Sequence, residues 1–243
     1  IERETLNDSG GWFVWDREDP DVFYFCRNYG EQSSFVSHSV KTGKETVLRR
    51  FPGNVGAWCI SKDNRYVLCK QMFREKPLAE RTRVILVDLK DGKDRILDPK
   101  GHIHQLWFTK LPDYSFEFEY EHHGGYEAGQ YREGNFMMTL DGKIKLIYGG
   151  EGVWAGHRAH SPSGEWMCPG GALQIINKLT GEVRSLGTIG GNHQAWETED
   201  SWLAASSGAH LIRFAADGRG FIHRIASHNS RLGHSTYWSE AHP

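Results

Sequence analysis

Residues 57–70 read AWCISKDNRYVLCK, and after a polar segment residues 83–97 read RVILVDLKDGKDRIL. Both stretches contain short runs of apolar and β-branched residues, which are typical of β-strands. The polar segments SKDNR and KDG fall between these runs and are rich in turn-forming residues. The glycine of KDG accepts the positive φ angles that a tight hairpin requires. The stretch therefore predicts four consecutive strands connected by turns.

The same pattern recurs along the chain. Five units are visible, at residues 15–51, 57–97, 105–148, 157–186 and 193–226. Each unit has its own late turn, and these read KTG, KDG, LDG, LTG and ADG. Units of about 35–50 residues with several short strands are typical of propeller blades. Since no long segment keeps a helical period, we predict an all-β fold, a β-propeller with four-stranded blades.

The number of units bears on domain organisation. A sixth unit is expected to begin near Glu240, and the last blade of a closed propeller pairs with the first. We therefore expect residues 1–243 to form one propeller domain whose C-terminal blades are missing. A complete five-bladed protein is the alternative.

Composition limits the function classes. The formal net charge of the 243 residues is -2, so no general basic field favours nucleic acid. No apolar run reaches membrane-spanning length, and no signal-peptide core is present, although the sequence starts at Ile1 rather than Met. We expect neither nucleic acid nor a membrane as partner, and favour a secreted or periplasmic location over a cytoplasmic one.

Four cysteines are present, and none belongs to a C-x-x-C pair, so a cysteine zinc site is not expected. Most of them end or begin apolar strand-like runs, which favours buried hydrophobic roles. A disulfide is the alternative if the protein is secreted.

The thirteen histidines are concentrated near the first strand of the units. The histidines at such places are His102, His104, His157, His160, His193 and His242. First strands line the channel of a propeller, so residues at equivalent positions converge on its axis. We expect His104, His157 and His193 to face one channel, where histidine serves as metal ligand or acid–base group. Packing is the alternative role. The outer-strand histidines His38, His210 and His223 are expected to face solvent.

Two further polar clusters are candidates for binding. The first is a glycine-containing loop with His122, His123, Tyr126, Tyr131 and Arg132. Arginine can form paired hydrogen bonds to a carboxylate, so this mixture suits an acidic sugar, whereas a solvated loop is the alternative. The second, looser cluster ends the chain and contains His228, Asn229, Ser230, Arg231, His234, Tyr237, Glu240 and His242.

Several short motifs resemble the oligogalacturonate lyase family and the related propeller lyases that act on ulvan and other uronate polysaccharides. They are GHIHQ at 101–105, YEHHGG at 120–125, QYR at 130–132, AGHRAHSPSG at 155–164, NHQAW at 192–196 and AHP at 241–243. The resemblance covers residues 58–243 in outline. It implies a seven-bladed propeller and a divalent metal, usually manganese, held by histidines and a glutamine; calcium or zinc are alternatives.

The resemblance also assigns roles. It implies that His157 is the catalytic base, that Arg132 is an active-site arginine, and that His193 and His242 bind the metal. We expect His234 as a further metal ligand. Substrate contacts are expected from His104, His123, Arg231 and Tyr237. The substrate is expected to be an acidic oligo- or polysaccharide.

The sequence departs from the family pattern in two places. The family continues its metal motif as H-P-H, whereas this chain stops at Pro243, so one expected ligand would lie beyond it. The family commonly has G-H-E at the base, whereas this chain has Gly156-His157-Arg158. Ulvan lyases, which use His, Tyr and Arg without a catalytic metal, match His122, Tyr126, Tyr131 and Arg132 nearly as well.

The implied reaction is β-elimination. A metal, Arg132 or Arg158 would neutralise the carboxylate, and His157 or a tyrosine would remove the neighbouring proton. Two other classes stay open. A non-catalytic binding propeller would use the histidines for packing, but only Trp15-Asp16 forms the Trp-Asp dipeptide of interaction propellers. A propeller glycoside hydrolase would need two carboxylates on the axis.

Overall fold

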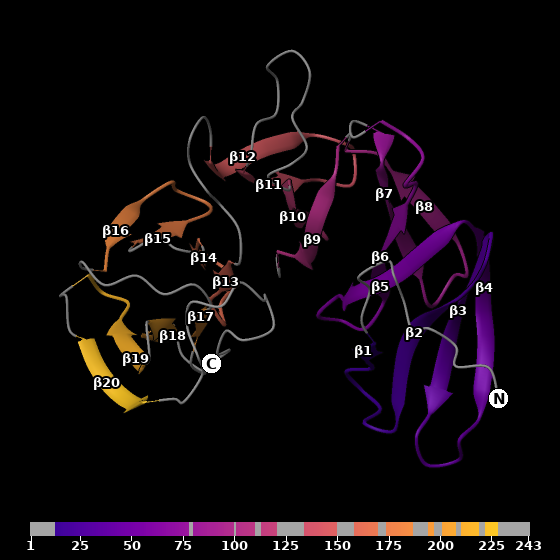
Figure 1. The fold of residues 1–243 in the computed structure, drawn as a ribbon, viewed down its shortest axis with the longest axis horizontal. Helices are drawn as coiled ribbons and strands as arrows, with labels where there is room; N and C mark the ends of the chain where they lie inside the picture. The colour runs from indigo at the N-terminus through magenta and orange to yellow at the C-terminus, as the bar shows by residue number, and fades with distance from the viewer. Residues whose placement is uncertain are drawn as a thin grey trace. The chain divides into compact units, whose positions relative to one another are not determined.

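The computed structural model is an all-β protein. It describes residues 13–77, 80–99, 101–109, 113–120, 134–149, 158–169, 174–186, 194–196, 201–207, 210–218 and 222–227. The described residues contain twenty strands in five four-stranded sheets and no α-helix. No described helix could cross a membrane. Each sheet is built from strands that follow one another in the chain (Figure 1).

The strands of the first three sheets correspond to the first three predicted units. The first sheet contains β1 (Val14–Trp15), β2 (Val22–Tyr29), β3 (Gln32–Ser39) and β4 (Glu45–Pro52). The second contains β5 (Asn54–Ile60), β6 (Tyr66–Met72), β7 (Thr82–Asp88) and β8 (Asp94–Leu97). The third contains β9 (Ile103–Phe108), β10 (Phe116–Tyr120), β11 (Gly134–Met138) and β12 (Ile144–Gly149).

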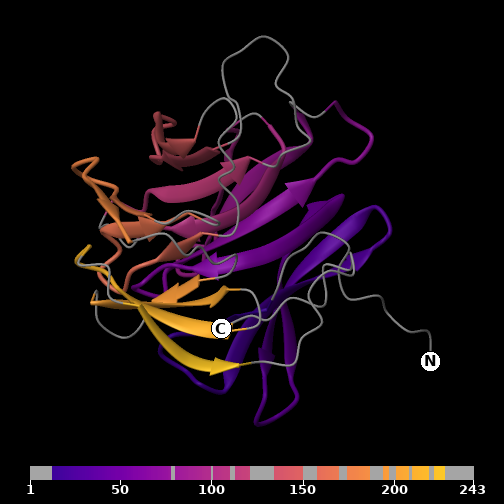
Figure 2. The ribbon, with the colours of Figure 1, turned by 60° about the vertical axis from the view of Figure 1, so that its left-hand side comes forward.

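The last two sheets have shorter strands. The fourth contains β13 (Ala159–His160), β14 (Trp166–Cys168), β15 (Gln174–Asn177) and β16 (Val183–Ser185). The fifth contains β17 (Gln194–Trp196), β18 (Trp202–Ser207), β19 (His210–Ala215) and β20 (Ile222–Ser227). In every sheet the strand that comes first in the chain is one edge and the fourth is the other, and we call them the inner and the outer strand. Figure 2 shows the same sheets turned by 60° about the vertical axis.

The chain divides into two compact units. One contains residues 1–132 and 136–145, and the other contains residues 133–135 and 146–243, so the division passes through the third sheet. Each unit has its own hydrophobic clusters, and each is described separately below.

The turns between the third and fourth strands confirm the predicted hairpin chemistry. The last residue of the KTG, KDG, LDG, LTG and ADG turns has positive φ in all five sheets, at Gly43, Gly92, Gly142, Gly181 and Gly218. A side chain at such a position would be strained. These turns therefore fix where each outer strand begins.

The core of the first unit explains the continuous apolar run of β7. Val84 and Leu86 pack in a cluster with residues of the third sheet, whereas Ile85 and Val87 pack in a cluster with residues of the first. Alternate side chains of a strand point to opposite faces. Because both faces of the second sheet are covered, its central strands need no polar face.

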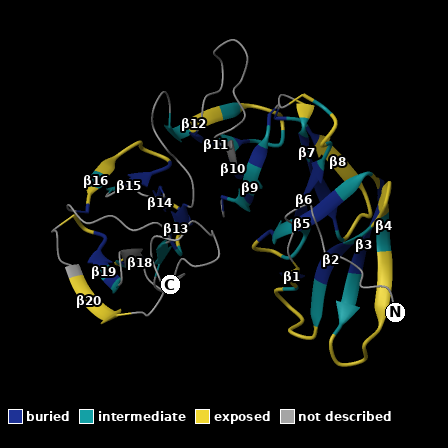
Figure 3. Ribbon diagram, in the orientation of Figure 1, coloured by how far each residue is buried: buried dark blue, intermediate teal, exposed yellow. Residues whose placement is uncertain are grey.

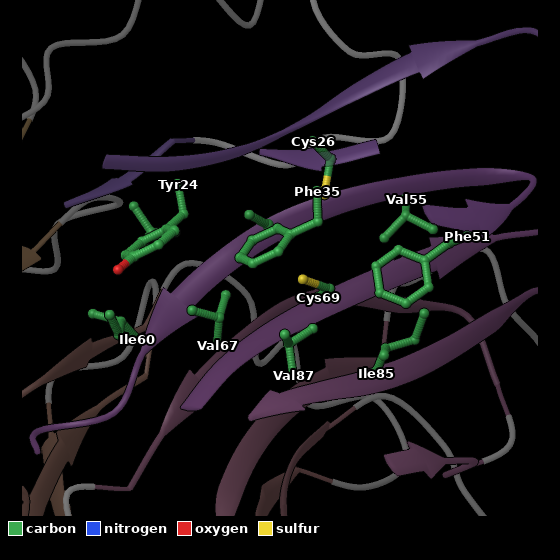
Figure 4. Packing of buried hydrophobic residues seen from close by; sticks show 12 residues of the cluster. Tyr24, Cys26, Phe35, Phe51, Val55, Ile60, Val67, Cys69, Ile85 and Val87 are labelled. Atoms are coloured by element: carbon green, nitrogen blue, oxygen red, sulfur yellow. The ribbon is translucent and has the colours of Figure 1, made fainter. Parts of the chain in front are cut away.

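The interface between the first and second sheets is apolar and closely packed. Tyr24 and Phe35 from the first sheet face Val67 and Cys69 from the second (Figure 4). Phe35 is fully buried. Outer strands such as β4 are mostly exposed, in contrast to the buried central strands (Figure 3).

Side-chain hydroxyls near the start of third strands anchor the inner strand of the next sheet. The amide of Val55 donates to Ser33 Oγ at 2.9 Å, and the amide of Ile103 donates to Thr82 Oγ1 at the same distance. Each hydroxyl also donates to the carbonyl oxygen of the glycine that lies two residues before the anchored amide. Ser33 donates to Gly53, and Thr82 donates to Gly101. This repeated device sets the position of β5 and of β9, which carries the predicted site residue His104.

Candidate functional site

Most of the predicted site residues lie outside the described residues. These are His122, His123, Tyr126, Tyr131, Arg132, His157, His193, Arg231, His234, Tyr237 and His242. The structure describes the other two, His104 on β9 and Arg158 directly before β13. Both are therefore on or next to an inner strand.

The strand registers define equivalent positions in the inner strands. The last paired residue of each inner strand lies opposite an apolar residue of the second strand. These last paired residues are Trp15, Ile60, Phe108, His160 and Trp196. This position holds an apolar side chain in the first, second, third and fifth blades, and the imidazole of His160 in the fourth.

Counting back along the chain gives a second set of equivalent positions. His157 precedes His160 by three residues, and His193 precedes Trp196 by three residues. In the third blade the residue three before Phe108 is Gln105, and His104 is one step earlier. Gln105 thus occupies the same position in the count as His157 and His193, three residues before the last paired residue of its inner strand. It is partly exposed. The sequence analysis missed it because it matched histidines; counting from the turn would have found it.

Arg158 is a buried arginine whose hydrogen bonds to Asn135 and His160 lie inside the second unit. Its side chain is almost inaccessible, at 6% residue exposure. Nη1 donates to Oδ1 of Asn135, which is fully buried on β11, and Nε donates to Nε2 of His160 at 3.3 Å. A ring nitrogen that accepts a hydrogen bond carries no proton, so these contacts place the His160 proton on Nδ1.

These contacts bear on the predicted role of Arg158. A guanidinium that binds a substrate carboxylate needs accessible donors, whereas Arg158 is directed at Asn135 and His160. The geometry therefore favours Arg158 as a residue that orders the beginning of β13. In chain position it directly follows His157.

A tryptophan ties the inner strands of the fourth and fifth blades together. Nε1 of Trp196 on β17 donates to the carbonyl oxygen of Ala159 on β13 at 3.3 Å. Gln194, two residues earlier, is partly buried and lies opposite Ala205. The inner strands of the second unit therefore carry hydrogen-bonding side chains among mainly apolar second-strand partners.

His104 is held through its backbone. Its carbonyl oxygen accepts a hydrogen bond from Nζ of Lys70 on β6 at 2.9 Å, and its side chain is partly exposed. The sequence analysis gave Lys70 no role, because lysine in an alternating strand usually faces solvent.

The described residues contain no group of three or more His, Cys, Asp or Glu side chains arranged to hold a metal ion. The predicted metal ligands His193, His234 and His242 all lie outside the described part. The described cysteines are free thiols, and burial raises the pKa of Cys59 and of Cys168 to about 12. A thiol with so high a pKa is neutral near pH 7 and is a poor nucleophile or metal ligand, which agrees with the buried role predicted for these residues.

No protein-family model and no curated protein matches the sequence. Solved structures do match. An oligogalacturonate lyase in complex with manganese superposes with a TM-score of 0.67 at 17% identity, covering 91% of this chain and 65% of that chain. The β-propeller domain of the trilobed protease from Pyrococcus furiosus gives 0.56 at 14% identity, covering 89% and 68%. TolB from Acinetobacter baumannii gives 0.55 at 16% identity, covering 85% and 52%.

These similarities establish the fold. The chain is a β-propeller with four-stranded blades, as predicted, and it spans 65% of the length of the oligogalacturonate lyase that it resembles. The similar structures include an enzyme, a protease domain and TolB, at identities of 17% or less. At such identities the likeness concerns the fold and carries no family membership.

Proposed function

We propose that the protein is a polysaccharide lyase that cleaves uronate glycosidic bonds by β-elimination. The observation that carries the proposal is the change in the inner strands along the chain. Those of the third to fifth blades carry His104, Gln105, His160 and Gln194, and Arg158 directly precedes β13, whereas β1 and residues 57–60 of β5 are apolar. The fold likeness to an oligogalacturonate lyase supports the same reading.

The reaction needs three groups. The proton on the carbon next to the uronate carboxylate moves to a base, a carbon–carbon double bond forms, and the bond to the glycosidic oxygen breaks. In our proposal His157 is the base, and Arg132 neutralises the carboxylate as negative charge develops. His122, Tyr126 and Tyr131 are the candidates for protonating the leaving oxygen.

Arg158 has a different place in this proposal from the one predicted. Since its guanidinium contacts Asn135 and His160, we assign it the ordering of the segment around His157 rather than contact with the substrate. His104, His123, Arg231 and Tyr237 remain the proposed substrate contacts. Gln105 joins them because it occupies the same position in the count as His157 and His193.

A divalent metal is part of the proposal. His193, His234 and His242 would hold it. Neutral imidazoles are a donor set that suits zinc, whereas manganese is proposed from the likeness to the lyase that binds it. When bound, such an ion supplies positive charge next to the substrate carboxylate.

The proposal is tested on a panel of acidic polysaccharides that contains pectin-derived oligogalacturonate and ulvan. The measurement is the ultraviolet absorbance of the unsaturated uronate, with and without a chelator and added manganese. We expect absorbance to rise on at least one substrate and to fall on chelation. Activity that resists chelation would favour the ulvan-type alternative without a catalytic metal.

A non-catalytic binding propeller is the second candidate. It stays open because the chain shares its fold with TolB, at a TM-score of 0.55, as well as with the lyase, and a shared fold does not imply a shared function. In that case acidic polysaccharides would bind, or fail to bind, with no new absorbance on any substrate.

A further inference from the structure

One lysine of the first unit is almost completely buried. Lys70 on β6 has 4% of its surface exposed. Its Nζ donates to the carbonyl oxygens of Ile103, at 3.3 Å, and His104, at 2.9 Å. It also lies 4.2 Å from the centroid of the Trp58 ring. Removing an ammonium group from water is unfavourable unless other contacts replace its hydration, and here two carbonyls and an aromatic face do so.

The first of these contacts is at an irregularity of β5. The pairing with β6 passes from Ala57 opposite Cys69 to Cys59 opposite Leu68. Trp58 therefore has no residue opposite it, as in a β-bulge. Its ring packs at the edge of the cluster between the second and third sheets, where Lys70 lies over it.

The second contact is at an irregularity of β9. The pairing with β10 passes from Gln105 opposite Glu119 to Ile103 opposite Tyr120, so His104 has no residue opposite it. A bulge changes the direction of its extra side chain, and bulges are frequent next to active sites. Both β5 and β6 pack against β9. A single ammonium group thus contacts the bulged residues of two neighbouring inner strands.

We propose that Lys70 is a positioning residue that holds the bulge at His104 and so directs the His104 side chain toward the substrate. This inference rests on the function proposed above, in which His104 contacts the sugar. Lys70 itself does not touch the substrate; it acts on the backbone of His104 through the 2.9 Å hydrogen bond.

Packing alone would not require a lysine here. Methionine has an unbranched side chain of similar length and adapts to irregular cores. Replacing a buried charge by an apolar side chain of similar volume is often neutral for stability. If Lys70 only filled space, Lys70→Met would leave both folding and substrate affinity unchanged.

The test compares Lys70→Met, Lys70→Arg and wild type for KM, kcat, melting temperature and the NMR resonances of the His104 ring. Lys143→Met is the matched control, because Lys143 lies in an exposed turn and pairs only locally with Asp141. We expect Lys70→Met to raise KM about tenfold, because a displaced His104 side chain loses its own contact with the substrate, and one hydrogen bond is worth about that factor. We expect kcat and the melting temperature to change little, and Lys70→Arg to restore KM in part.

A melting temperature that falls while KM stays at the wild-type value would overturn the proposal, because Lys70 would then be structural only. If Lys70→Met melts below the assay temperature, Lys70→Arg carries the comparison, since it keeps the charge but moves the donors. A wild type without lyase activity would remove the proposed function. The role of Lys70 in positioning His104 is then tested by the NMR resonances of the His104 ring. They shift in Lys70→Met if Lys70 positions His104, and they stay unchanged if it does not.

Discussion

Strands β5 and β13 hold the same place in their sheets but carry different side chains. Ile60 of β5 lies opposite Val67, and His160 of β13 lies opposite Met167. Val67 and Met167 are both fully buried. The second strands thus keep the same apolar role, while the inner strand changes from hydrophobic to polar.

This difference distinguishes residues that hold the fold together from residues that are candidates for catalysis. Two residues before these positions stand Trp58 and Arg158, the first packed on an apolar cluster and the second bonded to Asn135 and His160. Since the second blade folds with Trp58 and Ile60 at these two positions, a four-stranded blade does not in general require polar residues there. We therefore expect substitution of the proposed base to act on activity, and substitution of side chains buried in or between the sheets, polar or apolar, to act on stability.

The largest effect is expected from His157→Ala. Loss of a general base lowers turnover by about 10²–10⁴-fold, whereas binding of the substrate is nearly unchanged. The measurement is unsaturated-product formation alongside a melting curve. Glu165→Ala is the control, because Glu165 is exposed in the nearby turn. Near-normal activity of a stable His157→Ala protein would exclude His157 as the base and make Tyr126, Tyr131 or His122 the candidate.

A framework substitution should behave in the opposite way. Phe35 is fully buried between the first and second sheets. Phe35→Ala should lower the free energy of unfolding by about 3–5 kcal/mol, through lost burial and a cavity. The kcat of the protein that remains folded should be unchanged. Val47→Ala, at an exposed position of β4, should change stability by less than about 0.5 kcal/mol. A lower kcat in Phe35→Ala below its melting transition would contradict the separation.

The buried pair of Arg158 and Asn135 sharpens the comparison further. Arg158→Leu places at this position the residue type of its equivalent Leu106. It leaves the Asn135 amide without the guanidinium, which should lower the free energy of unfolding by about 1–3 kcal/mol. The double variant Arg158→Leu with Asn135→Leu removes both polar partners and should recover much of that loss, as denaturant unfolding would show. Strictly additive losses would mean that the two residues do not act as a pair.

The smallest effect concerns pH and the first blade. Burial raises the pKa of Asp16, but hydrogen bonds from Asn64 and Tyr24 outweigh it, and the pKa lies below its usual value. A lowered folded-state pKa contributes stability that is fully present above the unfolded value of about 3.9 and is lost as pH falls through the folded one. Asp16→Asn should therefore flatten the fall in melting temperature below about pH 5. Asp21→Asn, on the adjacent exposed turn, should leave the profile as in wild type.

Local sequence was sufficient to predict the strands and turns. The run RVILVD and the glycines at the end of the KTG and KDG turns depend on neighbours a few residues away, and the structure confirms both. The five units correspond to the five sheets because each blade is made of consecutive strands.

The environment of long polar side chains was not predictable in this way. Lys70 reaches a carbonyl 34 residues away, and Arg158 reaches Asn135, 23 residues away. Whether such a side chain is buried depends on which strand of the next sheet it meets. The bulge at His104 was not predictable either, because no local pattern marks it, and it places Gln105 rather than His104 three residues before Phe108 in regular pairing.

The mass of the product released from a uronate oligosaccharide tests the central claim most directly. Elimination adds no water, so the account predicts fragments with one unsaturated end, whose summed mass equals that of the substrate. Fragments heavier in sum by one water would show hydrolysis, and an intact substrate across the whole panel would show a binding protein. Either result would contradict the proposal that this propeller is a lyase.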